Sequence, residues 1–144
     1  MLARLIYVSE AAKAIKPGDL EDILNVARQK NHLSDISGML LYDHEGFLQV
    51  LEGDAQVLSD LLLSIGQDTR HKRVRLLEFR EVAQRHFGDW AMGFASACKS
   101  HRQIFLRHTA AGRFLPYDLS AASALAVLVE LSSAPSPKSE ATAG

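Results

Sequence analysis

Residues 36–53 read ISGMLLYDHEGFLQVLEG, which is two apolar runs on either side of the polar turn Asp43-His44-Glu45-Gly46. Two such runs joined by a short turn containing glycine are typical of a β-hairpin, with Gly46 at a positive φ angle. Side chains alternate between the two faces of a strand. The second strand is therefore expected to place Phe47, Gln49 and Leu51 on one face and Leu48, Val50 and Glu52 on the other.

Gln49 is an uncharged amide inside this otherwise apolar strand. An amide that is buried without a hydrogen-bond partner costs about 1–3 kcal/mol by protein mutational scales. Gln49 is therefore expected to bond to a polar core residue, a water or a ligand.

Composition bounds the class of protein. The chain has 144 residues, of which 47% are hydrophobic, and this favours one globular domain. With 16 Lys and Arg against 17 Asp and Glu, the net charge of −1 predicts binding to neither nucleic acid nor an anionic membrane. The start lacks a signal-peptide pattern and no apolar run approaches the roughly 18 residues of a membrane span, so we predict a cytoplasmic protein. The single cysteine, Cys98, excludes an intrachain disulfide and a cysteine-cluster metal site.

The flanking segments predict the element order β-α-β-β-α-β-β. Residues 2–9 form a strand with Tyr7 and Leu5 on one face. A helix capped by Asp19 runs to about Asn31, and a second helix starts at Asp54. Residues 74–82 form a weakly alternating strand, and a short last strand carries Trp90, Met92 and Phe94 on one face. This order indicates an α+β, ferredoxin-like sheet with both helices on the same face.

The last third of the chain predicts a helical cap. Residues 118–132 are apolar nearly all round, with Asp118 as a candidate N-cap. Such a helix should cover the free sheet face or meet another subunit. We therefore divide the chain into a domain of residues 1–96, a helical extension of residues 97–133, which packs on the sheet or forms an oligomer interface, and a tail of residues 134–144 with the composition of a disordered linker.

Five residues spread over this order form a set: Tyr7, Asn31, Gln49, Trp90 and Met92. The sequence around these residues reads RLIYVSEAA near the start, ILNVARQKNHLSDISGMLLYDHEGFLQVLEG in the middle, then DTRH and FGDWAMGF. In this order and spacing, residues 1–96 resemble the BLUF family of blue-light sensors that bind FAD. The short remainder resembles that of stand-alone members with a helical cap and no fused output domain.

The resemblance implies roles for single residues. Tyr7 matches the tyrosine that donates an electron and then a proton to the excited flavin, and Gln49 matches the glutamine that lies between that tyrosine and the ring and rearranges after excitation. Asn31 matches the asparagine that orients the ring, and the neighbouring Lys30 stands where many members carry Asn or His. Trp90 and Met92 match the pair on the last strand that responds to the glutamine. Besides Tyr7, Asn31 and Gln49, the cofactor contacts implied are Lys30, Asp68, Arg70, His71 and Met92.

The resemblance also implies partners. It predicts FAD as the cofactor, no metal, no catalytic activity, an unidentified downstream signalling protein and a homo-oligomer. The apolar breadth of residues 118–132, with Leu119, Ala122, Leu125, Ala126 and Val129 on one stripe, supports the last of these.

Other interpretations of the same residues remain open. Taken singly, Tyr7, Trp90 and Met92 are ordinary core residues, Asn31 is a helix C-cap, and the basic run 70–73 is a solvated loop. Two rival functions are a light-insensitive flavin or small-ligand module and a small flavin-dependent redox enzyme. No nucleophile motif or nicotinamide-binding glycine motif supports an enzyme.

Overall fold

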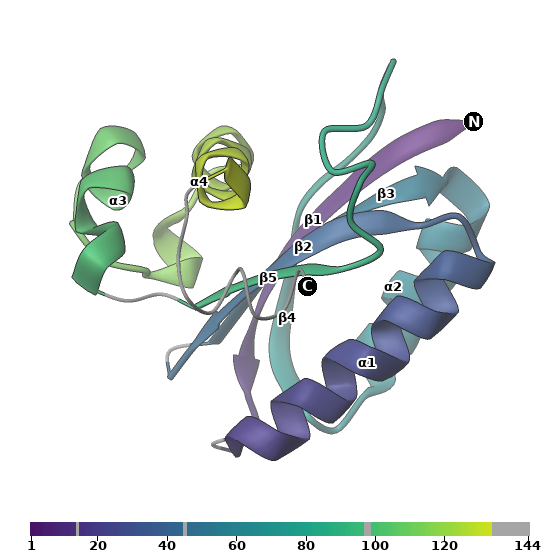
Figure 1. The fold of residues 1–144 in the computed structure, drawn as a ribbon, viewed down its shortest axis with the longest axis horizontal. Helices are drawn as coiled ribbons and strands as arrows, with labels where there is room; N and C mark the ends of the chain where they lie inside the picture. The colour runs from purple at the N-terminus through teal and green to yellow at the C-terminus, as the bar shows by residue number, and fades with distance from the viewer. Residues whose placement is uncertain (14, 45, 97–98, 134–144) are drawn as a thin grey trace.

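The structure is a computed structural model that describes residues 1–13, 15–44, 46–96 and 99–133 (Figure 1). The elements in chain order are β1 (Leu2–Ala11), α1 (Pro17–Leu33), β2 (Ser37–Asp43), β3 (Gly46–Asp54), α2 (Ala55–Gln67), β4 (His71–Glu81), β5 (Gly93–Ser96), the 3₁₀ turn η1 (Lys99–His101), α3 (Arg102–His108), the 3₁₀ turn η2 (Pro116–Asp118) and α4 (Ala121–Ser133). The predicted order of the first seven elements is confirmed. The interpretation of Cys98, and that of the tail beyond residue 133, lie outside the described residues.

One five-stranded sheet organises the chain, in the order β4-β1-β3-β2-β5. The pairs β4-β1, β1-β3 and β3-β2 are antiparallel, and β5 joins β2 in parallel. Each βαβ unit therefore has a strand of the other unit inserted between its two parallel strands, which is the split arrangement of ferredoxin-like folds. The predicted α+β, ferredoxin-like fold is confirmed.

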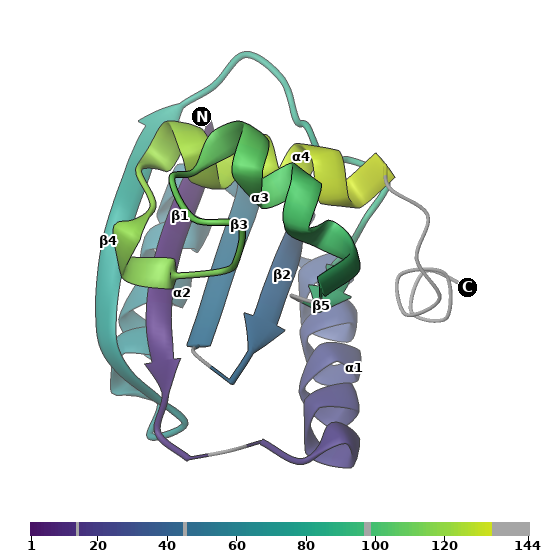
Figure 2. The same cartoon turned by 90° about the vertical axis from the view of Figure 1, so that its left-hand side faces the viewer.

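Helices cover both faces of the sheet. Figure 1 shows α1 and α2 on one face and α3 and α4 on the other, and Figure 2 looks onto the second face. Each face has its own apolar core. The core under α1 and α2 contains Tyr7, Phe47 and Leu51, whereas the core under α4 contains Leu48 and Val50. The predicted alternation along β3 is therefore confirmed, and Gly46 has the expected positive φ of 151°.

The helix starts follow the sequence at α2 and depart from it at α1. Asp54 caps α2, because its carboxylate accepts from the backbone N–H groups of Gln56 and Val57. The prediction that Asp19 caps α1 is wrong. The N-cap lies three residues earlier, at Lys16, which makes no side-chain capping bond, and the helix begins at Pro17, whose fixed φ suits the first helical position.

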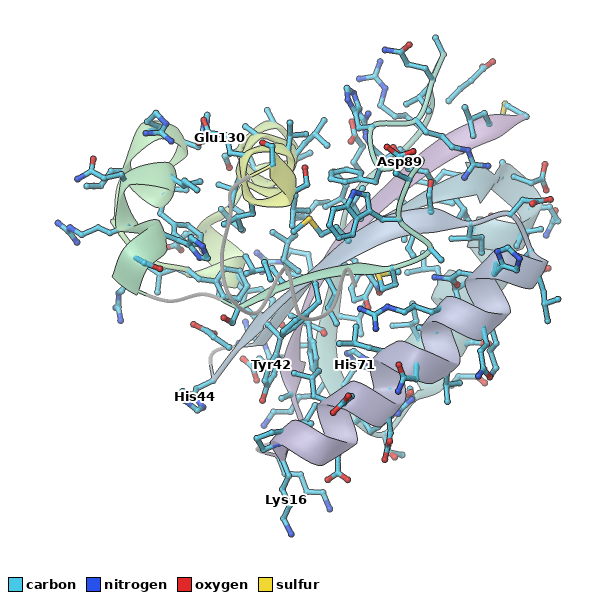
Figure 3. All side chains as sticks on the ribbon, in the orientation of Figure 1. Lys16, Tyr42, His44, His71, Asp89 and Glu130 are labelled. Carbon is cyan, nitrogen blue, oxygen red and sulfur yellow. The ribbon has the colours of Figure 1, made fainter. Side chains whose placement is uncertain are left out.

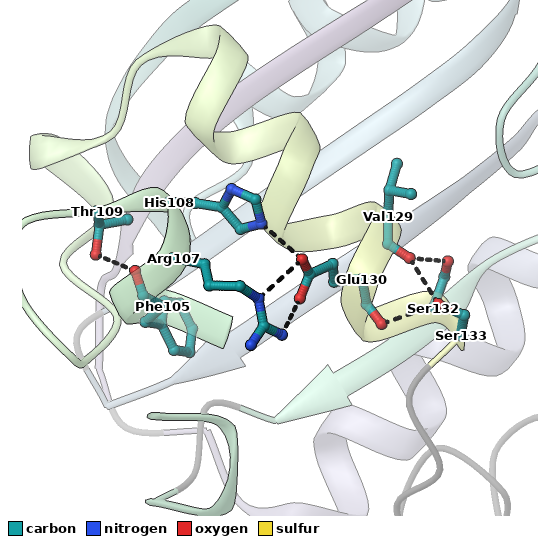
Figure 4. Close-up of polar contacts among 8 residues, drawn as sticks. All are labelled: Phe105, Arg107, His108, Thr109, Val129, Glu130, Ser132 and Ser133. Atoms are coloured by element: carbon teal, nitrogen blue, oxygen red, sulfur yellow. Dashed lines mark hydrogen bonds and ion pairs between the residues drawn. The ribbon is translucent and has the colours of Figure 1, made fainter. Parts of the chain in front are cut away.

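Helix α4 packs on the sheet, and α3 packs on α4. The buried face of α4 consists of Ala124, Val127, Leu128 and Leu131. Asp118 is not its N-cap, because residues 116–118 form η2, and Ser120 and Ser123 bond to each other across the first turn instead. Figure 4 shows how α3 and α4 are joined: Arg107 Nε lies 3.2 Å and His108 Nε2 2.9 Å from Glu130 Oε1.

Candidate functional site

A cavity of about 860 Å³ lies between α1, α2 and the sheet. Tyr7 on β1 and Gln49 and Leu51 on β3 line it from the sheet. Its apolar walls come from the two helices and include Ile23, Ala27, Leu61 and Ile65. Small-molecule sites in proteins have volumes of about 300–1,000 Å³ and are mostly apolar with a few polar groups, so this cavity has the size and lining of a ligand site.

Tyr7 and Gln49 are direct neighbours across the β1–β3 pair, and the Tyr7 hydroxyl donates to Gln49 Oε1 at 2.5 Å. Tyr7 is only 2% exposed. Burial raises the pKa of its phenol far above the usual value; Asp68 raises it further and Arg70 partly opposes the shift. Tyr7 is therefore a neutral donor at neutral pH. The β1–β4 pairing is irregular on both sides of this position, between Ile6 and Tyr7 and between Val8 and Glu10, as strands often are beside functional sites.

Gln49 also contacts Met92. Its amide Nε2 lies 3.3 Å from the sulfur of Met92, which is buried but does not line the cavity. A thioether sulfur is a weak acceptor, so this side of the amide is held less firmly than the side bonded to Tyr7. The amide thus has one strong partner, Tyr7, and one weak partner, Met92.

Trp90 and Met92 do not share a face. Met92 and Phe94 belong to the core under α1 and α2, whereas Trp90 packs against the core under α4. The prediction of a common face is wrong because β5 starts only at Gly93, so the alternation of a strand does not extend back to Trp90. The indole occupies the space beside Gly93, where an added Cβ would lie 2.7 Å from Trp90 Cε3.

Asn31 and Lys30 line the cavity from α1. Asn31 is buried, and its Nδ2 donates to the carbonyl of Ala91 at 2.9 Å. The alternative in which Asn31 ends the helix is wrong, because α1 continues to Leu33. Lys30 is exposed at the rim, where it contributes a positive charge.

Asp68, Arg70 and His71 all line the cavity. The Arg70 guanidinium lowers the pKa of Asp68 to about 2, and the two side chains form an ion pair. Figure 3 places His71 in the layer between the sheet and α1. Its Nδ1 lies 2.8 Å from Ser9 Oγ. Its ring packs edge-on against the ring of Tyr7, with 6.2 Å between the two ring centroids. Burial lowers the pKa of His71, Asp68 opposes that shift and Arg70 adds to it, so the ring is neutral near pH 7.

Several polar residues that support the site were not predicted. Ser9 holds His71, and Arg28 Nε donates to the carbonyl of Met92 at 3.0 Å. Glu52 is fully buried and accepts from the backbone N–H groups of His86 and Phe87. The sequence did carry a signal for Glu52, since alternation turned this charged residue toward an apolar face.

Within the described part of the chain, no group of His, Cys, Asp or Glu residues could hold a metal ion, and no helix is long and apolar enough to cross a membrane.

Comparison with known proteins gives a consistent result. A family model described as "BLUF: Sensors of blue-light using FAD" matches residues 2–93. Photoactivated adenylate cyclase subunit alpha from Euglena gracilis is 38% identical over 87 residues, and the blue light- and temperature-regulated antirepressor BluF from Escherichia coli is 32% identical over 92 residues. The alignment spans 60% of this chain but only 8% of the cyclase, and 64% of this chain but 23% of the antirepressor.

Two solved structures are similar over most of their length. The photo-activated state of BlsA has a TM-score of 0.84 and 31% identity, and the alignment covers 94% of this chain and 97% of BlsA. The dark state of the BLUF protein BlrB has a TM-score of 0.74 at 26% identity, with 90% of this chain and 93% of BlrB covered.

Proposed function

The chain belongs to the BLUF family, sensors of blue light using FAD, and on this basis we propose that it signals through a light-driven change in the hydrogen bonds of Tyr7 and Gln49. The family match describes a sensor, so the chain is a photoreceptor domain rather than an enzyme. The observation that carries the proposal is a chain of two contacts beside the cavity. The Tyr7 hydroxyl donates to the Gln49 amide oxygen, and the Gln49 amide nitrogen contacts the Met92 sulfur.

The cavity suits a flavin. Its apolar walls match a flat aromatic ring, and the side-chain amides of Asn31 and Gln49 match the polar edge of that ring. The charges of Lys13 and Lys30 suit the phosphates of FAD, while the charge of Arg70 is offset by Asp68. We propose Tyr7, Lys30, Asn31, Gln49, Asp68, Arg70 and His71 as the residues that hold the cofactor, with Met92 in contact through Gln49. The bound flavin supplies the absorption of blue light and a ring that accepts an electron.

The residues of the chain supply the switch. The buried Tyr7 phenol keeps its proton and donates to Gln49 in the present arrangement. Gln49 has both donors and an acceptor, so it can release Met92 and exchange partners without a large movement of the backbone. A local change of this kind becomes a structural signal when it favours one of two packed arrangements.

We propose that this signal passes from Met92 to β5 and the C-terminal helices. β5 follows Met92 directly, and α4 contacts β5 on the other face of the sheet. The outer side of α4, with Ala122 and Val129 exposed, is proposed to form a homo-oligomer contact or the surface for a downstream signalling protein. A cytoplasmic location stays a prediction from the sequence.

Purified protein tests the function directly. We expect the protein to copurify with oxidised flavin, mainly FAD, and to show a small, reversible red shift of its absorption under blue light. Flavin without a light-induced shift would indicate the light-insensitive module. Flavin turnover with a soluble electron donor and no shift would indicate the redox enzyme, and a folded protein that cannot be loaded with flavin would exclude every function that depends on flavin.

A further inference from the structure

Arg28 links α1 to the segment before β5. Its Nε donates to the carbonyl of Met92 at 3.0 Å, and Asn31 Nδ2 donates to the carbonyl of Ala91 at 2.9 Å. Arg28 and Asn31 stand three residues apart on the helix and therefore project from the same face. Two consecutive carbonyls of the segment are thus held by neighbouring side chains of α1.

The bond from Arg28 is placed where the backbone has little other support. Met92 lies in a bend, outside the helices and strands, and the ladder to β2 begins at Gly93. The side chain of the same residue contacts Gln49 through its sulfur. The position of the Met92 main chain therefore decides whether that sulfur reaches the amide.

The guanidinium of Arg28 makes its hydrogen bond to the carbonyl of Met92. Its Nη2 is buried and has no hydrogen-bond partner among the described residues. Arg28 does not line the cavity, although its neighbours Ala27, Lys30 and Asn31 do. A buried donor without a partner is unfavourable, so the placement of the half-buried Arg28 side chain is better explained by its bond to the Met92 carbonyl than by an ion pair or by ligand contact.

We propose that Arg28 is a positioning residue for the light switch, which acts by fixing the main chain of Met92 so that its sulfur abuts Gln49. This inference rests on the proposed function. Return to darkness requires Gln49 to regain its contact with Met92, so a loosely held Met92 slows thermal recovery. The absorption shift itself depends on Tyr7 and Gln49 and keeps its size.

Dark recovery of the flavin-loaded full-length chain tests the proposal. Arg28→Met removes the donors at similar length and should slow recovery about fivefold, the rate equivalent of one hydrogen bond of about 1 kcal/mol. Arg28→Gln carries an amide nitrogen at the same distance along the side chain as Nε, so it should recover within about twofold of wild type. Gln29→Met, at an exposed position on the same helix, is the matched control and should not change the rate.

A double-mutant cycle separates positioning from general destabilisation. In a Met92→Leu background the contact through sulfur is gone, so Arg28→Met should add less than about twofold. An undiminished fivefold effect in that background, or recovery of Arg28→Met within twofold of wild type, would overturn the proposal. A wild-type protein without a light shift would instead refute the proposed function.

Infrared spectroscopy of wild-type protein in the dark gives a readout that needs no stable Arg28 variant. With methionine labelled at the ¹³C carbonyl, the isotope-shifted band that is lost in Met92→Leu belongs to the Met92 carbonyl, and it is expected at the frequency of a hydrogen-bonded carbonyl because Arg28 Nε donates to this oxygen. A band at the frequency of a carbonyl without a hydrogen bond would also overturn the proposal.

Discussion

Glu52→Gln is expected to destabilise the protein strongly, although the change replaces one oxygen by an NH₂ group. Glu52 is fully buried, and its Oε1 accepts from Ser37 Oγ at 2.8 Å and from the Phe87 N–H at 2.9 Å. Its Oε2 accepts from the His86 N–H at 2.6 Å. These bonds attach β3, the strand of Gln49, to the segment that leads to Trp90 and Met92.

The expected loss in the free energy of unfolding follows from the hydrogen bonds that a glutamine cannot accept. A glutamine can keep its oxygen toward Ser37 and Phe87, but its NH₂ group then faces the His86 N–H. One charge-assisted bond of about 1.5–3 kcal/mol is lost and a buried N–H is left without an acceptor. We expect the free energy of unfolding to fall by about 2–4 kcal/mol. At about 4 °C per kcal/mol for a domain of this size, Tm should fall by roughly 8–16 °C.

Thermal and urea unfolding of flavin-loaded protein measure this loss. Glu81→Gln is the matched control, since Glu81 is exposed on β4 and its replacement should change stability by less than about 0.5 kcal/mol. If Glu52→Gln lost less than about 1 kcal/mol, the burial and bonding assigned to this carboxylate would be wrong.

Two further predictions concern acid stability and assembly. The pKa of Asp68 falls from 3.8 to about 2 on folding, so its pair with Arg70 stabilises the protein above pH 3.8. That contribution is lost as the pH falls toward 2. Asp68→Asn should therefore remove this part of the decline in Tm at acid pH. Val129→Glu on the outer side of α4 should lower the molar mass measured by light scattering. Leu33→Glu, at an exposed position at the end of α1, is the control and should not change it. A wild-type protein that is monomeric in both dark and light would contradict the proposed oligomer. Leu128→Glu is unsuitable for this purpose, because Leu128 is fully buried against the sheet and its change would disturb folding.

The hairpin and the orientation of Gln49 could be predicted from the sequence, because successive side chains of a strand point to opposite faces of the sheet. The order of the first seven elements was also predictable, whereas the proximity of Tyr7 to Gln49 was implied only by the family resemblance and is seen in the pairing of β1 with β3. Asp54 was a predictable cap because the side chain acts within its own turn. These features depend on local chemistry or on a regular repeat.

Features that depend on tertiary placement were missed. Alternation was extended from β5 back to Trp90, where the chain is not a strand, so Trp90 was assigned to the wrong face. Nothing in the sequence distinguishes Arg28 from an exposed helix residue, because its bond depends on α1 lying beside the Met92 carbonyl. At the start of α1, the geometric preference of Pro17 outweighed the capping tendency of Asp19.

The light-minus-dark absorption spectrum of three proteins tests the central claim most directly: wild type, Tyr7→Phe and Gln49→Leu. Each variant removes one partner of the Tyr7–Gln49 bond while keeping similar volume, and such core changes usually cost less than about 1.5 kcal/mol. We therefore expect both variants to retain flavin. The account predicts a reversible red shift in wild type and none in either variant. A normal reversible shift in Gln49→Leu would contradict it.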